Sequence, residues 1–518
     1  MITLIVPPGI KSFSGLQMHV PNPPLGIAYV AAAVREAGYP YRVIDGTGEA
    51  LDAIYPYTDR TDFLVQGLTF DEIAERIPAE TDVIGLSCMF STLWPITHRL
   101  AQTVRQRFPQ ALFVLGGEHG TAVPEYVLKN SPFDVVVLGE GEETFIELVR
   151  AHYSRRPFRD VKGVAFRDGQ GIVNTELSPR KRDIDSIKPP DWDSVPIEEY
   201  IARHQINGAN LGRSMPLLAT RGCPFQCTFC SSPGMWTQRW IARTPKLVAD
   251  EMELYLHKYR VTNFDFQDLT AIINRQWIID FSKELMRRNL KITWQMPSGT
   301  RAEAFDEEVS DLLYRSGCRA LAFAPESGSP EILKVIKKQV NLGKMLRSME
   351  IAIKRGLKLA CFIVIGFPDE TPATLRQTMK LIRKMAVLGV YDISVSKFVP
   401  YAGSELFIRL QREGKIKLDD EFFTSPMDFY TQKAPSYADA VPTRRLYWTM
   451  IWMFVNFYVI SFALRPFRVM RTLAKATFVG VEEARYAKWF VDRFFVRRRW
   501  RRLASASTRR HRMGQEPT

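Results

Sequence analysis

The sequence contains few cysteines, and this scarcity limits how the chain can be stabilised. Only 6 of its 518 residues are cysteine. Disulfide frameworks are typical of short secreted chains rich in cysteine, so we do not expect one here. A secretory signal is not expected either, because the apolar run Ile2–Val6 has no basic segment before it and no cleavage site after it. Both absences predict a protein of the reducing cytoplasm.

Acidic residues are scarce only toward the C-terminal end. The chain carries a net charge of +14, and residues 441–518 contain 17 Lys and Arg against 4 Asp and Glu. Residues 1–440 are therefore nearly neutral. A basic tail on a neutral body predicts contact with an anionic surface, either a membrane or a nucleic acid.

Short apolar runs alternate with helical patterns through residues 1–150. The predicted strands are Ile2–Val6, Tyr41–Ile44, Val83–Ser87, Leu112–Leu115 and Val135–Leu138. Helical patterns such as Gly26–Ala37 and Pro95–Arg107 lie between them. Continuous apolar strands separated by helices predict an α/β domain with a doubly wound, Rossmann-like parallel sheet. Ligands of such sheets bind at the carboxyl ends of the strands.

A second alternation begins after an irregular bridge. Residues 151–213 are rich in Pro, Asp and Lys, with a predicted hairpin at residues 168–171. Residues 214–415 contain six further strands, which are predicted at Pro216–Thr220, Asn263–Phe266, Ile292–Gln295, Ala320–Phe323, Leu359–Ile365 and Asp392–Phe398. Helical patterns separate them, which predicts a partial (β/α)6 barrel of the TIM type with its chemistry at the carboxyl ends of the strands. Residues 416–518 are predicted to form a helical C-terminal region.

Three of the six cysteines gather directly after the first predicted barrel strand. Cys223, Cys227 and Cys230 have the spacing C-x₃-C-x₂-C. Three thiolates at this spacing can hold a [4Fe–4S] cluster with one iron left open. A structural zinc ion usually takes four protein ligands, and the next candidates are the distant His257 and Cys318. The spacing favours the cluster and leaves zinc as the alternative.

Together with Phe229, this motif resembles the signature of the radical S-adenosylmethionine (SAM) enzymes. Segments at later strand ends resemble the same family, namely Asp268, then Ser298 and Arg301, then Glu326-Ser327, and then Gly366 in Ile-Gly-Phe-Pro-Asp-Glu-Thr. The resemblance implies that the three cysteines carry the catalytic cluster and that these other residues surround SAM.

The N-terminal segment resembles the cobalamin-binding domain that precedes many radical SAM barrels. The residues that carry this resemblance, or lie at the same strand ends, are Pro24, Leu25, Gly26, Ser87, Met89, Gly116, Gly117, Glu118, His119, Gly139, Glu140, Gly141 and Glu142. The chain lacks the motif D-x-H-x-x-G, which supplies a histidine to cobalt, and His119 follows Gly-Gly-Glu instead. The resemblance therefore implies cobalamin without implying histidine ligation. A domain that folds and binds nothing is the alternative.

The combined resemblance is to a group that includes the anaerobic magnesium-protoporphyrin IX monomethyl ester cyclase and the class B radical SAM methylases. It implies a 5′-deoxyadenosyl radical derived from SAM, and methylation of an unactivated carbon in a hydrophobic small molecule or lipid. It also implies an electron donor of the flavodoxin or ferredoxin type. A radical cyclase without net methyl transfer is the alternative, and a cobalamin-binding sensor or scaffold is the alternative from another class.

The segment Leu446–Leu464 contains no charged residue. As a helix it would be about 28 Å long, close to the ~30 Å hydrocarbon core of a bilayer. The stretch Arg465–Arg502 then interleaves aromatic residues with arginine, as interfacial amphipathic helices do. Three placements are open, namely association with the inner membrane surface, burial against the barrel, and a membrane span. The long apolar run favours a membrane over nucleic acid.

Overall fold

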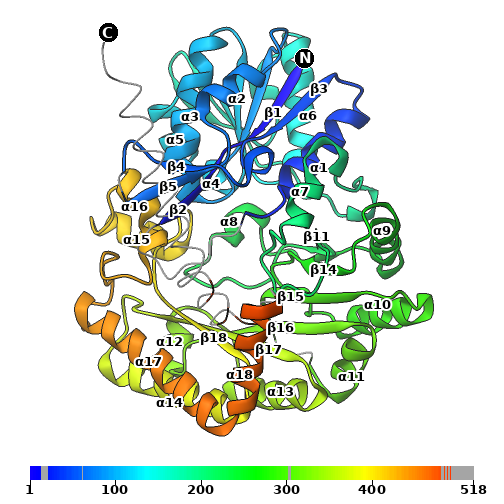
Figure 1. Cartoon of the computed structure of the whole chain (residues 1–518). Helices are drawn as coiled ribbons and strands as arrows, with labels where there is room; N and C mark the ends of the chain where they lie inside the picture. The colour runs from blue at the N-terminus through cyan, green and yellow to red at the C-terminus, as the bar shows by residue number, and fades with distance from the viewer. Residues whose placement is uncertain are drawn as a thin grey trace, which may run out of the picture.

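A computed structural model describes residues 1–12, 21–60, 62–301 and 305–479, together with residues 484, 487 and 491. Figure 1 shows an N-terminal α/β unit at one end of the molecule and a second α/β unit at the other. The chain passes between them through the segment that precedes β11 (Ser214–Leu217). The two-unit α/β architecture predicted from the sequence is confirmed.

The N-terminal sheet has seven strands in the order β10-β9-β8-β7-β6-β1-β3. The parallel strands are β1 (Ile2–Val6), β3 (Tyr41–Asp45), β6 (Val83–Ser87), β7 (Leu112–Gly116) and β8 (Val135–Val137). Ile2 and Leu4 enter one core cluster and Ile5 enters another, so β1 is buried on both faces. Helices α1 (Leu25–Glu36) and α6 (Gly141–Tyr153) cover one face, and α2 (Phe70–Arg76) and α3 (Trp94–Arg107) cover the other.

Two further groups of strands complete this unit. The hairpin β9 (Val164–Asp168) and β10 (Gly171–Asn174), which we expected inside the bridge, pairs antiparallel with β8 and extends the sheet. A separate antiparallel sheet of β2 (Gly9–Ser12), β5 (Phe63–Gln66) and β4 (Ile54–Pro56) was not predicted. The N-terminal sheet thus continues past residue 150 before the chain reaches the barrel.

Six parallel strands form the barrel in sequence order. They are β11, β14 (Asn263–Phe266), β15 (Thr293–Thr300), β16 (Cys318–Glu326), β17 (Lys358–Ile365) and β18 (Asp392–Lys397). The outer helices include α9 (Pro245–Lys258), α10 (Arg275–Arg288), α11 (Glu307–Arg315), α13 (Leu342–Arg355) and α14 (Pro372–Leu388). The first predicted strand is divided, because β12 (Thr220–Arg221) leaves the barrel sheet to pair with β13 (Ile241–Ala242). The partial (β/α)6 barrel is confirmed.

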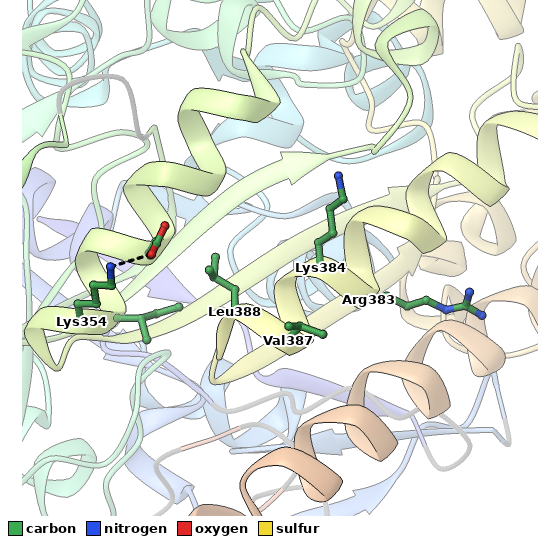
Figure 2. A pocket seen from close by; sticks show the side chains of 7 residues that line it. Lys354, Arg383, Lys384, Val387 and Leu388 are labelled. Carbon is green, nitrogen blue, oxygen red and sulfur yellow. Dashed lines mark ion pairs between the residues drawn. The ribbon is translucent and has the colours of Figure 1, made fainter.

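Helix α17 (Thr443–Leu464) packs along α14 and the last strand, β18. It is the one helix among the described residues that is long and apolar enough to cross a membrane, and 28% of its most apolar window is buried. Helix α17 therefore covers the barrel with one side and exposes the other. Helix α18 (Pro466–Ala474) follows it, and a groove between α13 and α14 lies nearby (Figure 2). The predicted aromatic and basic stretch beyond residue 479 lies outside the described residues, apart from three isolated positions.

Candidate functional site

The three cysteines lie on a loop of residues 222–231, here named the cysteine loop, between β12 and α8 (Ser232–Trp236). All three thiols are free and partly buried. The backbone of Thr228 fixes the loop to the barrel, because its N–H donates to the Ile336 carbonyl at 3.1 Å and its carbonyl accepts from the Leu406 N–H at 2.8 Å. The loop is thereby held over the carboxyl ends of the barrel strands.

The donor set of the cysteine loop fits an iron–sulfur cluster better than a single ion. Among the described residues, no three His, Cys, Asp or Glu side chains converge on one metal position. The three thiolates of a cubane cluster bind three different irons and need not converge, whereas one zinc ion would require it. Burial raises the pKa of the Cys227 thiol to about 11 in the metal-free chain, against the attraction of Lys338. Binding of iron would displace that proton.

Charged residues surround the cysteine loop on its barrel side. Lys338 is almost fully buried, and its ammonium pairs with the Glu326 carboxylate at 3.0 Å. Glu326 ends β16 with φ of 63°, a rare conformation for a residue with a side chain, so the backbone is held there by its surroundings. Arg301 lies with its guanidinium 3.6 Å from the centre of the Phe225 ring. Lys338 and Phe225 were not predicted as site residues from the sequence. Each acts through a partner that is distant along the chain, Glu326 for Lys338 and Arg301 for Phe225.

Two predicted SAM-binding residues make hydrogen bonds within the protein. The buried Asp268 carboxylate accepts from the Ala219 N–H at 3.2 Å, and from the Thr220 N–H at 2.5 Å and hydroxyl at 2.6 Å. The Ser327 hydroxyl contacts the Thr378 hydroxyl at 3.2 Å. Asp268 therefore shapes the approach to the cysteine loop, and Ser327 anchors β16 to α14. Their roles toward SAM stay predictions.

Other predicted SAM-binding residues lie at the strand ends as expected. Phe229 packs on Phe367, with ring centres 5.6 Å apart, which joins the cysteine loop to the turn after β17. Gly366 in that turn has φ of 88°, and its N–H donates to the buried Glu370 carboxylate. Ser298 is partly buried within β15. Their roles toward SAM stay predictions.

The carboxyl edge of the N-terminal sheet meets the cysteine loop. Glu118, which begins α4 (Glu118–Ala122), accepts a hydrogen bond from the Ser231 hydroxyl, next to Cys230. Gly117 has φ of 105°, and a Cβ there would lie 2.6 Å from the Cys88 carbonyl oxygen, so this turn needs glycine. Met89 beside it is 40% exposed. The segment of predicted cobalamin residues 116–118 is thus joined, through the Glu118–Ser231 hydrogen bond, to the residue that follows the predicted cluster ligand Cys230.

The remaining predicted cobalamin residues lie around the same edge. Ser87 ends β6 and is partly buried. Gly139 has φ of 74°, and a Cβ built on it would lie 3.5 Å from the carbonyl oxygen of Met235 in α8, which is an ordinary contact distance. Pro24, Leu25 and Gly26 begin α1 and are partly or fully exposed, and Gly141 is the first residue of α6. These residues are free to approach a ligand, and their contacts with cobalamin stay predictions.

His119 does not face the sheet edge. Its ring stacks on Trp94 at 4.6 Å and meets Phe423 edge-on at 4.9 Å, and Nδ1 lies 3.0 Å from the Ser91 hydroxyl. Burial lowers the pKa of His119 to about 3. The side chain packs in the core between α3 and α16 (Asp420–Thr424), and its role toward the cofactor stays a prediction.

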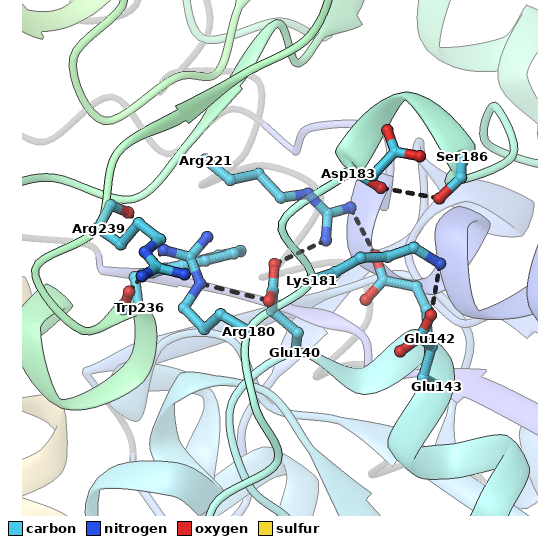
Figure 3. Close-up of polar contacts among 10 residues, drawn as sticks. All are labelled: Glu140, Glu142, Glu143, Arg180, Lys181, Asp183, Ser186, Arg221, Trp236 and Arg239. Carbon is cyan, nitrogen blue, oxygen red and sulfur yellow. Dashed lines mark hydrogen bonds and ion pairs between the residues drawn. The ribbon is translucent and has the colours of Figure 1, made fainter.

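Glu140 and Glu142 form an ion-pair network with the start of the cysteine loop (Figure 3). Arg221 donates to Glu140 at 3.1 Å and to Glu142 at 2.6 Å, and Arg180 from the bridge pairs with Glu140 at 3.3 Å. Although burial opposes ionisation, Arg221 holds the pKa of Glu142 below its usual range. The two carboxylates therefore join the N-terminal unit to the barrel, and their contacts with the cofactor stay predictions.

Tyr401 follows β18, and its phenol has Cys230, Glu118 and Glu326 among its electrostatic neighbours. Its side chain is 48% exposed, yet surrounding protein desolvates the phenol and, with Cys230, Tyr430, Glu118 and Glu326, raises its pKa to about 12. Tyr401 was not predicted from the sequence, because it lies in an irregular segment without a motif.

Comparisons with known proteins agree with this arrangement. Residues 217–382 match the model of the radical SAM superfamily, and residues 16–149 match the B12 binding domain. An uncharacterized methyltransferase of Pyrococcus horikoshii is 31% identical over 78% of this chain and 82% of its own length. The chain belongs to the cobalamin-binding radical SAM enzymes.

Further relatives of this radical SAM enzyme carry transferase and cyclase names. The cytidylyl-2-hydroxyethylphosphonate methyltransferase of Streptomyces wedmorensis is 28% identical over 77% of this chain and 80% of its own length. Anaerobic magnesium-protoporphyrin IX monomethyl ester cyclases also match. The solved structure of the radical SAM methyltransferase TsrM from Kitasatospora setae has a TM-score of 0.62 at 20% identity, with coverage of 80% of this chain and 76% of that one. The last likeness supports the fold.

Membership of the family settles the cofactors. The radical SAM domain implies a [4Fe–4S] cluster and SAM, and the B12 binding domain implies cobalamin. The protein is a radical SAM enzyme with methyltransferases among its relatives. The arrangement described above fits three cofactors, because the cysteine loop and the carboxyl edge of the N-terminal sheet touch through Ser231 and Glu118.

Proposed function

We propose that this enzyme transfers a methyl group to an unactivated carbon of a hydrophobic small molecule or lipid. The observation that carries the proposal is the contact of the cysteine loop and the preceding strand β12 with the edge of the N-terminal sheet, through Ser231–Glu118 and Arg221–Glu142. Radical formation at a cluster and methyl donation from a corrin have to reach the same substrate carbon. A shared boundary between the two cofactor segments supports such a transfer.

The hydrophobic nature of the substrate is supported by the residues that border this boundary. Tyr401 is 48% exposed, and its electrostatic neighbours include Cys230, Glu118 and Glu326. Met89 and Phe90, at the end of β6, expose 40% and 63% of their side chains although they are apolar. Ligand pockets are mostly apolar with a few polar groups that fix orientation. The phenol of Tyr401 would supply such a polar group.

The chain and its cofactors divide the work. When bound, the cluster, SAM and cobalamin supply the radical and methyl chemistry. Cys223, Cys227 and Cys230 would hold the cluster, and Lys338 places a positive charge beside Cys227 and Glu326. The Arg221 network positions the cysteine loop against the N-terminal unit. A low-potential donor of the flavodoxin or ferredoxin type would deliver electrons, and such a donor supports a cytoplasmic location.

Product analysis of an anaerobic reaction tests the proposal. Reconstituted enzyme is mixed with SAM, cobalamin, a reductant and a membrane-lipid extract, and 5′-deoxyadenosine and S-adenosylhomocysteine are quantified together. We expect both to rise in step with consumed substrate. A rise of 5′-deoxyadenosine alone contradicts methyl transfer and supports a cyclase-type reaction. The absence of both, in protein with an intact cluster, supports a sensor or scaffold.

A matched cysteine series tests the ligand assignment. Replacing Cys223, Cys227 or Cys230 with alanine is expected to abolish the absorbance of the reconstituted cluster and 5′-deoxyadenosine formation. Cys318→Ala changes a buried thiol outside the loop, and we expect it to retain the cluster. Equal loss in all four variants would show a general failure to fold and not the loss of a ligand.

A further inference from the structure

One outer face of the barrel carries positive charge without negative charge. Helices α14, α17 and α18 contain eight Lys and Arg residues and no Asp or Glu. Figure 1 places these helices together at the end of the molecule away from the N-terminal unit. We name this surface the basic face. An uninterrupted positive field of this kind attracts an anionic partner.

An apolar stripe runs along the exposed side of α17. Its members are spaced four and three residues apart, which places them on one side of the helix. They are Trp448, Trp452, Val455, Val459 and Phe462, with exposed fractions of 55%, 57%, 40%, 61% and 49%. Phe467 and Met470 extend the apolar surface onto α18 with 85% and 59% exposure. Apolar side chains of this size are seldom left in water as a continuous stripe.

A groove beside this stripe also combines apolar side chains with lysine and arginine. It encloses about 500 Å³ between α13 and α14, with Ile353, Val387 and Leu388 as its apolar lining (Figure 2). Lys354, Arg383 and Lys384 surround the lining, and Lys354 is paired with Glu350 at 2.8 Å. Arg383 also donates to Asn456 of α17 at 2.9 Å, so the groove and α17 belong to one surface.

We propose that the basic face docks on an anionic lipid bilayer, with α17 lying along the membrane surface. Tryptophan and phenylalanine favour the boundary between headgroups and acyl chains, and Lys and Arg favour anionic lipids. A second copy of the chain is a poorer occupant, because a symmetric contact would bring cations against cations with no acidic residue on these helices to pair them. The combination of aromatic stripe and cations fits the bilayer.

The other side of α17 keeps the helix on the protein. Leu446, Met450, Met453 and Phe457 are buried against the barrel. The Tyr458 hydroxyl donates to the Asp392 carboxylate at 2.7 Å, and the Arg465 guanidinium donates to the Ala386 carbonyl at 3.1 Å. A span across the bilayer would place these polar pairs in hydrocarbon, at a high cost. The helix is therefore expected to lie in the plane of the interface.

The position of α17 also relates the membrane to the site. Its first turn contacts the turn after β17, where Leu446 lies against Gly366. Docking would thus bring the carboxyl edge of the barrel close to the bilayer, where a lipid is available. This delivery of a lipid rests on the proposed function, but the binding of the bilayer itself does not.

Co-sedimentation of the full-length holoenzyme with vesicles tests the inference. We expect binding to vesicles of equal parts phosphatidylglycerol and phosphatidylcholine, and none to phosphatidylcholine alone. Trp448→Ser/Trp452→Ser and Lys380→Glu/Lys384→Glu are each expected to weaken binding about tenfold or more. Lys129→Glu/Arg150→Glu makes the same change of net charge on the N-terminal unit, where both side chains are at least 60% exposed, and is expected to bind normally.

Three results would overturn the inference. The first is failure of the wild-type holoenzyme to sediment with anionic vesicles, and the second is an equal loss of binding in the Lys129/Arg150 control. The third is a dimer in light scattering that Trp448→Ser/Trp452→Ser abolishes, since this would assign the stripe to a second copy. Formation of 5′-deoxyadenosine in the same samples reports on the proposed reaction separately, so failure of the membrane inference and failure of the chemistry are distinguishable.

Discussion

At the scale of single residues, His119 occupies a site that favours its neutral form. Trp94 and Phe423 enclose the ring, and Nε2 has no hydrogen-bond partner among the described residues. Burial lowers the pKa to about 3, whereas the unfolded chain has a value of about 6.5. Between these values the unfolded chain binds a proton that the folded chain does not. Falling pH therefore favours unfolding through this residue.

We predict that His119→Phe reduces the loss of thermal stability between about pH 7 and pH 5. Phenylalanine keeps the aromatic packing and removes the proton that the unfolded chain takes up. Buried Asp265 and Asp268, whose pKa values burial raises to about 7 and about 6, work in the opposite direction, so the comparison with wild type is the informative quantity. The exposed His257→Phe serves as the control. If both variants show the same pH dependence, His119 does not titrate as described.

The cysteine loop could be found in the sequence, whereas much of its environment could not. Ligand spacing in a cluster motif is local, so Cys223, Cys227 and Cys230 stand out without a structure. The partner of a carboxylate is set by tertiary structure, and this is why Glu140 and Glu142 were predicted beside a cofactor but lie against Arg221. Lys338 and Tyr401 reach the site from segments without any motif.

At the scale of elements, the contact between α17 and the turn after β17 depends on Gly366. This residue has φ of 88°, and a Cβ there would lie 2.4 Å from Leu446 Cδ2. The left-handed conformation costs roughly 1–2 kcal/mol for a residue with a side chain. Alanine would therefore add backbone strain and a clash with α17.

We predict that Gly366→Ala lowers the melting temperature of the wild-type protein. The same change is expected to lower the melting temperature less when it is made in the Leu446→Ala variant. The recovery should be partial, because the smaller side chain removes the clash but leaves the strain. Differential scanning calorimetry of the four proteins gives the coupling. Strict additivity of the two changes would mean that α17 does not rest on this turn.

Strands were predictable where burial was decided locally, and their pairing was not. The parallel strands are continuous apolar runs because both faces are covered, so their positions followed from composition. The hairpin β9–β10 was recognised, but its pairing with β8 is a non-local choice. The small sheet β2-β5-β4 joins Gly9–Ser12 to strands more than 40 residues later, and no periodicity in the sequence reports such a contact.

At the scale of the whole molecule, the Arg221 network decides how the two units meet. Its guanidinium binds two carboxylates of the N-terminal unit, while its backbone leads directly into the cysteine loop. Removing one partner of a buried ion pair typically costs about 3–5 kcal/mol, because a charge is left unpaired. Lysine cannot reproduce the fork of a guanidinium, so Arg221→Lys is not conservative here.

We predict that Arg221→Met destabilises the protein strongly and that Arg221→Met/Glu142→Gln is less unstable than the sum of the two separate changes, because a neutral amide at position 142 needs no counter-charge. Glu140 stays unchanged, because it also pairs with the buried Arg180. In the surviving folded fraction, the cluster should form, because the cysteines are untouched.

If the network sets the distance between the cofactors, Arg221→Lys should decrease the yield of S-adenosylhomocysteine more than the yield of 5′-deoxyadenosine. The reason is that cleavage of SAM needs the barrel alone, whereas methyl transfer needs both units in place. Equal decreases of the two products, at unchanged cluster content, would mean that Arg221 stabilises the fold without positioning one cofactor against the other.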